Sequence, residues 1–167
     1  AASDVYKRQV MGITIGSQDP SAPSFGIYSG VHGLERITTQ VCLSFLNSLI
    51  FQLSWDKDLR KRFENFRIVS IPIVNPVGMA YNQRSNQNGI DLMRNAPLDC
   101  LEPSHFLISG HRISSKIPWY RGMKNQEMEG ESKALIKFVR ENQMQSKVSL
   151  ALDSVSYTHL RAHETGR

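Results

Sequence analysis

The sequence has little cysteine: Cys42 and Cys100 are the two that occur among its 167 residues. Two unpatterned cysteines exclude a disulfide framework and a cysteine-based zinc cluster. Cys42 falls within an apolar helical pattern and is predicted to be a small buried side chain. Long apolar runs are missing too, because none approaches the ~18 residues of a membrane span. We therefore expect no membrane association, and no signal peptide is recognisable.

A strong imbalance of charge is also missing. The chain has 20 basic and 15 acidic side chains, a formal net charge of +5, and the basic excess is spread along the sequence. A dispersed excess is typical of a solvated surface, so we expect no nucleic-acid partner. The length suits one domain with a substantial hydrophobic core.

Both ends of the chain look foreign to the rest. Residues 1–9 and residues 155–167 resemble translated adapter sequence from sequencing libraries. Such segments belong outside fold reasoning, so His159 and His163 are not counted as ligands. We expect the natural portion to be residues 10–154, cut at both ends, with a net charge of +3. The alternative is a genuine basic tail.

Apolar periodicity predicts strands that alternate with helices. The expected strands are 10–15, 25–29, 67–74 and 147–153, and the expected helices are 35–53, 56–65 and 130–145. Asp56 is expected to cap the second helix, and Pro72 indicates a sheet edge, a bulge or a strand end. Residues 75–104 are interpreted as a long functional loop. This order predicts an α/β fold, with a central, mostly parallel or mixed sheet and helices on both faces.

The stretch from Gly30 to Glu35 follows an apolar strand and contains a histidine and a carboxylate. Glycines at 30 and 33 permit a tight turn, so that His32 and Glu35 can face one point beyond the strand end, where open α/β sheets bind ligands. Zinc accepts imidazole nitrogen and carboxylate oxygen, and catalytic zinc sites use three protein ligands. The stretch therefore predicts half of a metal site. The alternative is a surface histidine near a glutamate at a helix start.

A second stretch, residues 75–95, adds two arginines in a loop rich in glycine and asparagine. Arg84 and Arg94 offer fixed, paired donors that suit a carboxylate or an oxyanion. The alternative is a solvated loop with Asn-Gly turns.

In this order, the motifs resemble those of the zinc carboxypeptidase family. The family's His-x-x-Glu is matched by His32 and Glu35. Its Asn-Pro-x-Gly, its arginine and its Gly-Val-Asp-Leu-Asn-Arg-Asn are matched by residues 75–78, Arg84 and residues 89–95. Residues 118–122 and 131–135 resemble the segment that precedes the family's next helix. The resemblance covers most of 10–154 and implies a truncated catalytic domain of that fold.

The resemblance implies one zinc ion held by His32 and Glu35. It also implies that Arg84 polarises the scissile carbonyl and that Arg94 helps to bind a substrate carboxylate. The third ligand would be a histidine at position 155, where this chain has Val155, and the general-base glutamate would lie further downstream. We therefore expect the chain as written to bind zinc weakly and to have no useful turnover.

Met93 departs from the family pattern, which has asparagine at this position. A thioether cannot hydrogen-bond a carboxylate as an amide does. Three functions stay open: a carboxypeptidase-like peptidase that uses metal-activated water, a zinc amidohydrolase or deacylase of the same fold acting on N-acyl amino acids, and a metal-free α/β binding domain. The expected partner is a peptide or acyl-amino-acid substrate, the cytoplasm is the favoured compartment, and the oligomeric state is open.

Overall fold

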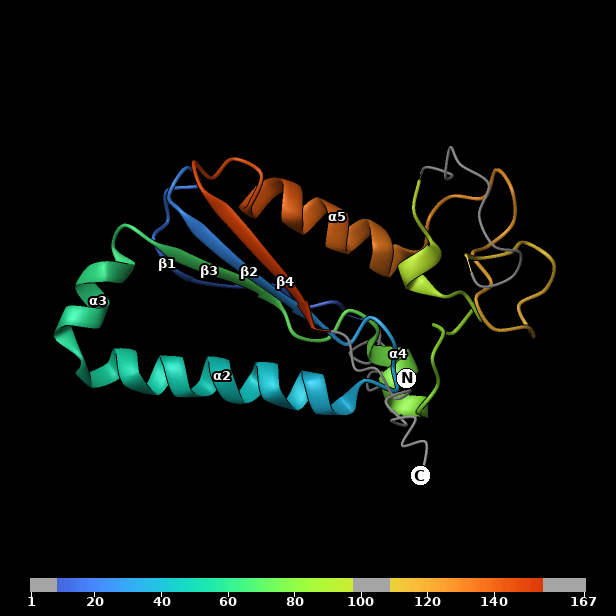
Figure 1. The fold of residues 1–167 in the computed structure, drawn as a ribbon, viewed down its shortest axis with the longest axis horizontal. Coiled ribbons are helices and arrows are strands. Elements are labelled where there is room, and N and C mark those ends of the chain that lie inside the picture. Colours follow the sequence, from blue (N-terminus) through green and yellow to red (C-terminus); the bar gives the residue numbers. More distant parts are fainter. Residues whose placement is uncertain (1–8, 98–108, 155–167) are drawn as a thin grey trace, which may run out of the picture.

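The computed structural model describes residues 9–97 and 109–154 (Figure 1). Its elements in chain order are β1 (Ile13–Gly16), β2 (Ser24–Ser29), α2 (Arg36–Trp55), α3 (Lys57–Phe63), β3 (Arg67–Ile71), α4 (Pro76–Tyr81), the 3-10 turn η1 (Leu92–Arg94), α5 (Gly130–Asn142) and β4 (Ser149–Ser154). Every strand and helix predicted from the sequence is present, with its ends shifted by a few residues. Residues 1–8 and 155–167, which belong to the two segments expected to be foreign, lie outside the described residues, as does Cys100.

Four strands form one mixed sheet in the order β1-β3-β2-β4. β2 pairs in parallel with both β3 and β4, and β1 runs antiparallel to β3. Tyr28 is paired with Ile71 on one side of β2, and Ser29 with Ser154 on the other. The carboxyl ends of the three parallel strands therefore meet at one edge of the sheet, where the motif residues begin.

Helices cover both faces of the sheet, as predicted (Figure 1). α2 lies along one face, and a buried cluster joins it to the strands: Ile27, Cys42, Leu46, Leu49, Phe63 and Ile68. α5 lies on the other face, where the buried cluster consists of Tyr28, Val31, Ile71, Val74 and Leu92. Cys42 is 3% exposed, which confirms its predicted burial.

Local sequence signals account for several element ends. Asp56 caps α3 as predicted, because its side chain accepts a hydrogen bond from the backbone N–H of Leu59 at 2.9 Å. β3 ends at Ile71, so Pro72 lies directly after the strand and removes no hydrogen bond from the sheet. Pro72 therefore marks a strand end.

The prediction of one continuous loop over residues 75–104 was wrong in its first part, because α4 occupies Pro76–Tyr81. The side chain of Asn75 accepts a hydrogen bond from Gly78 N at 2.8 Å and so caps the helix. Pro76 stands at the start of the helix, where a missing N–H has no consequence. Asn82 ends the helix in the left-handed conformation, with φ of 55°.

The outer side of α2 is largely uncovered in the part of the chain that the structure describes. Its exposed apolar side chains are Ile37, Val41, Leu43, Phe45, Ile50, Phe51 and Trp55. By length and composition alone α2 could cross a membrane, a weak criterion that core helices of soluble proteins also meet. β4 likewise exposes Leu150 and Leu152, and among the described strands it pairs only with β2.

Candidate metal centre

The turn that carries His32 begins directly after β2 and is shaped by two glycines. Gly30 has φ of 65°, in the left-handed region that favours glycine. A Cβ added at Gly33 would lie 2.0 Å from the carbonyl carbon of Gly78, so the close contact with α4 requires glycine. The backbone N–H of Asn75 donates to the carbonyl of Gly30 at 2.8 Å. The turn is therefore fixed against the segment that follows β3.

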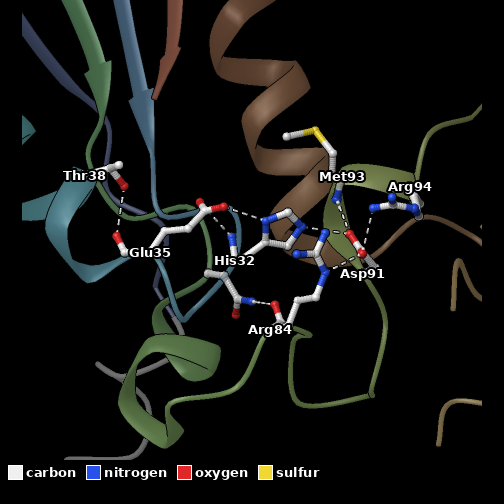
Figure 2. Close-up of polar contacts among 8 residues, drawn as sticks. His32, Glu35, Thr38, Arg84, Asp91, Met93 and Arg94 are labelled. Carbon is white, nitrogen blue, oxygen red and sulfur yellow. Dashed lines mark hydrogen bonds and ion pairs between the residues drawn. The ribbon is translucent and has the colours of Figure 1, made fainter. Parts of the chain in front are cut away.

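His32 and Glu35 face each other inside the molecule (Figure 2). Nδ1 of His32 lies 2.7 Å from Oε1 of Glu35, and the two residues are 3% and 4% exposed. Glu35 immediately precedes α2, but its side chain makes no capping hydrogen bond to the helix. The carboxylate is directed at the imidazole, which contradicts the alternative of a surface histidine near a helix-start glutamate.

Asp91 binds the opposite side of the His32 ring (Figure 2). Its Oδ1 lies 3.0 Å from Nε2 of His32, and its Oδ2 accepts from Nε of Arg84 at 3.0 Å and from Nη1 of Arg94 at 2.9 Å. Asp91 thus brings together three of the residues that the sequence predicted for the site. Sequence analysis assigned no role to Asp91, although it stands inside the arginine motif. Asp91 could have been suspected from the sequence, because a histidine that binds a metal usually donates its second ring N–H to a carboxylate or a carbonyl.

The charges around Asp91 favour its ionised form. Burial raises the pKa of the Asp91 carboxyl, but the hydrogen bond and charge of His32 and the charges of Arg84 and Arg94 outweigh it and lower the pKa to about 2. Burial lowers the pKa of His32, but the hydrogen bonds to Asp91 and Glu35 outweigh that effect and raise it above its ordinary value. Both shifts favour the charged form of the residue, the imidazolium of His32 and the carboxylate of Asp91.

The donor chemistry of the His32–Glu35 pair fits zinc. A neutral His32 whose Nε2–H is held by Asp91 directs the lone pair of Nδ1 towards Glu35. Histidine ligands in metal sites commonly donate their second N–H to a carboxylate in this way. Within residues 9–97 and 109–154, no group of three or more His, Cys, Asp or Glu side chains is arranged to hold a metal ion. The described part of the chain therefore offers two candidate ligands, His32 and Glu35.

β4 ends beside this pair. Its register sets Ser154 next to Ser29, three residues before His32. Partial burial raises the pKa of Asp153, and the negative charge of Glu35 raises it further, so the end of β4 lies within the electrostatic reach of the pair. Position 155, where the resemblance implies the third ligand, lies outside the described residues, and that ligand stays a prediction.

An apolar cavity of about 390 Å³ lies next to the centre, between α5, η1 and the carboxyl ends of the strands. Met93 lines it together with Val31 from the turn and Leu135 from α5, and Asp153 is among its few polar groups. The backbone N–H of Met93 donates to Oδ1 of Asp91 at 3.2 Å. The cavity and the His32 centre therefore share the segment that carries Asp91 and Met93.

Known proteins resemble this chain in sequence and in fold. A family model described as zinc carboxypeptidase matches residues 4–165. A metallocarboxypeptidase A of Trichophyton tonsurans is 33% identical over an alignment of 97 residues, with a coverage of 50% of this chain and 23% of that protein. The structure of a carboxypeptidase A from Helicoverpa armigera matches with a TM-score of 0.62 and 18% identity, covering 92% of this chain and 43% of that one. Bovine thrombin-activatable fibrinolysis inhibitor, in complex with a tick carboxypeptidase inhibitor, matches with a TM-score of 0.58 and 24% identity, covering 92% of this chain and 56% of that one. The α/β fold is that of carboxypeptidases, and the chain spans less than a quarter of its fungal relative.

Proposed function

This chain belongs to the zinc carboxypeptidase family, and on that premise we propose that its parent protein hydrolyses peptide bonds with metal-activated water. The observation that carries the proposal is the buried contact of 2.7 Å between His32 Nδ1 and Glu35 Oε1, with Asp91 behind the ring. His32 and Glu35 would hold one zinc ion, together with a third ligand from the residues after Ser154. Bound there, zinc would act as a Lewis acid and supply a water that ionises near neutral pH.

Arg84 is the residue that we assign to the scissile carbonyl. Its Nε–H donates to Asp91, which fixes the guanidinium, while its side chain remains 38% exposed. A donor fixed in advance stabilises the oxyanion that develops during amide hydrolysis. Arg94 shares the same oxygen of Asp91 and is 20% exposed, and we assign it to a carboxylate of the substrate. The general base is the glutamate that the resemblance places downstream.

The described residues supply part of a catalytic domain. The chain covers 43% of the Helicoverpa armigera structure, and the uncovered apolar sides of α2 and β4 are surfaces that the rest of such a domain would bury. With two candidate ligands among the described residues, and with the general-base glutamate expected further downstream, the 167-residue chain is expected to bind zinc weakly and to show no useful turnover. Zinc-dependent hydrolysis by this chain alone would contradict that expectation.

Metal content and hydrolysis of the parent protein with its complete catalytic domain test the proposal. We expect one zinc per molecule after dialysis, and loss of both zinc and activity in His32→Ala and Glu35→Gln. Glu141→Gln, which removes an exposed carboxylate on α5, is the matched control and should keep both. Full zinc content and activity in His32→Ala would refute the proposal, and absence of zinc from the wild type would favour a metal-free binding domain.

The apolar cavity beside Met93 favours a second candidate, an amidohydrolase that acts on N-acyl amino acids. Met93 places a thioether where the family pattern has an amide, and the cavity of about 390 Å³ around it offers space for an apolar group. A panel of peptides with a free carboxylate and of N-acyl amino acids separates the two candidates by kcat/KM. Met93→Asn should shift the preference towards free-carboxylate peptides by about tenfold or more. An unchanged ratio would remove Met93 as the determinant.

A further inference from the structure

Glu129 is a buried carboxylate at the start of α5 that the proposed chemistry does not use. It is 8% exposed and precedes the helix, but its side chain makes no capping hydrogen bond. Instead, its Oε2 accepts hydrogen bonds from the side-chain amides of Asn86 and Asn88, both at 2.7 Å. The ion pairs found among the described residues do not include Glu129. A buried carboxylate is stable only when its oxygens are hydrogen-bonded, and the amides of Asn86 and Asn88 supply these bonds to Glu129.

The side-chain amide of Asn86, which donates to Glu129, also binds the backbone of the loop that leads to Asp91. Asn86 is fully buried, and its Oδ1 accepts from the backbone N–H groups of Asn88 at 3.0 Å and of Ile90 at 3.1 Å. Its own backbone N–H donates to the carbonyl of Ile90 at 3.0 Å. The amide nitrogen of Asn86 donates to Glu129 at 2.7 Å and more distantly to Oε2 of Glu131 at 3.5 Å, so the amide oxygen points at the loop. The residue after this closed loop is Asp91.

Glu129 also fixes the segment that follows Asp91 in the chain, through its backbone N–H. The backbone N–H of Glu129 donates to Oδ1 of Asn95, directly after η1, at 2.8 Å. Asp91 is therefore held between two contacts from one residue, one at Asn86 and one at Asn95. Movement of Glu129 would shift Asp91 relative to His32, which lies 3.0 Å away.

We propose that Glu129 is a positioning residue of the metal centre, which holds Asp91 against Nε2 of His32 through the side chain of Asn86. The proposal rests on the proposed function for its metal, but the contact that Glu129 sets exists in the metal-free chain. Loss of an orienting partner of a histidine ligand typically weakens metal affinity by 10–100-fold. The expected effect of disturbing Glu129 therefore lies in this range.

Two substitutions of Glu129 distinguish the effect of its side-chain length from the effect of its charge. Glu129→Asp keeps the charge but shortens the side chain by one methylene, so it cannot reach both amides. Glu129→Gln keeps the reach, and its amide oxygen can still accept from both. Glu127→Gln is the matched control, because Glu127 lies two residues earlier and is exposed, paired with Lys133. We expect Glu129→Asp to weaken zinc affinity about tenfold or more, Glu129→Gln about threefold or less, and the control less than twofold.

Zinc affinity of the 167-residue chain is measured by competition with a chromogenic chelator, with His32→Ala as the blank for other zinc sites. The Nε2–H resonance of His32, assigned by its loss in His32→Ala, reports the contact with Asp91 without metal. We expect this proton to be slow to exchange in the wild type and fast in Glu129→Asp. A folded Glu129→Asp with unchanged affinity and unchanged exchange would overturn the proposal, as would equal losses in the aspartate and glutamine variants.

If Glu129→Asp does not fold, Asn88→Ala tests the positioning role of Glu129 instead. Asn88 is exposed, so its truncation leaves the core intact while removing one of the two donors to Glu129. Faster exchange of the His32 proton supports the proposal, and exchange at the wild-type rate overturns it. If the 167-residue chain binds no zinc through His32, its expected weak binding is wrong, but the exchange rates still decide the role of Glu129; the proposed function itself fails only if the parent protein holds no zinc.

Discussion

Replacement of Asp91 by asparagine removes the charge that joins His32 to the two arginines and keeps the size of the side chain. This carboxyl group is 2% exposed, and its pKa falls from 3.8 to about 2 in the folded chain. One pKa unit corresponds to about 1.36 kcal/mol, so the ionised carboxyl stabilises the fold by about 2 kcal/mol at neutral pH. We expect Asp91→Asn to lower the free energy of unfolding by about 2–3 kcal/mol, because a buried charge network loses its centre.

The same pKa sets the pH range of the effect. Because the folded-state pKa is lower than the value of 3.8, the stabilisation is complete well above pH 3.8 and is lost as the pH falls towards 2. At pH 3 about half of it, roughly 1 kcal/mol, should remain. Wild type and Asp91→Asn should converge in stability as the pH approaches 2.

Urea unfolding followed by circular dichroism at pH 7, 5 and 3 measures this difference on the chain itself. Glu141→Gln is the control, because it removes a carboxylate whose side chain is 59% exposed and which pairs with Lys137. Its effect should be below about 0.5 kcal/mol. Equal stability of Asp91→Asn and wild type at pH 7, or a difference that does not shrink towards pH 3, would refute the account of the charges at this centre.

Three further substitutions test the parts of the fold that support the centre. Gly33→Ala should lower the free energy of unfolding by about 3 kcal/mol or more, because its Cβ would meet the carbonyl carbon of Gly78 at 2.0 Å. Thermal unfolding measures this loss, and Gly130→Ala is the control, because a Cβ there meets nothing within 4 Å. Asp56→Ala should cost about 1 kcal/mol in urea unfolding, because α3 loses its cap. Burial raises the pKa of Tyr28 to about 12, so its contribution is complete below pH 10 and is lost as the pH rises from 10 to 12. Tyr28→Phe should therefore flatten the loss of stability between pH 10 and 12, and an unchanged slope would contradict this reasoning.

Elements with a local signal could be predicted from the sequence. The apolar run before Gly30 gave β2 almost to the residue, and Asp56 marked the start of α3. The segment after Asn75 was misread because its Asn, Pro and Gly content is typical of loops. The same three residue types make a cap, a first helical position and a close contact in α4. Residue composition alone could not distinguish a loop from the start of this helix.

Contacts between residues far apart in the chain could not be predicted from the sequence. Asp91 lies 59 residues after His32, and Glu129 lies 43 residues after Asn86. A carboxylate in a motif has many possible partners, and spacing along the chain does not choose between them. His32 and Glu35 could be paired because one turn holds both, whereas the acceptor behind the ring depends on the packing of three segments.

The order of the strands is what joins the motifs into one centre. β2 lies between β3 and β4, so the turn with His32 has one parallel strand end on each side. The end of β3 leads through Asn75 to the segment with Asp91, and the end of β4 brings Asp153 to the cavity beside α5. Side chains alternate between the faces of a strand, so a shift of β4 by one residue would move Asp153 to the α2 face. The pairing of Ser29 with Ser154 therefore fixes where β4 ends beside the His32 turn, and the proposed metal centre would depend on this register as directly as on His32 and Glu35.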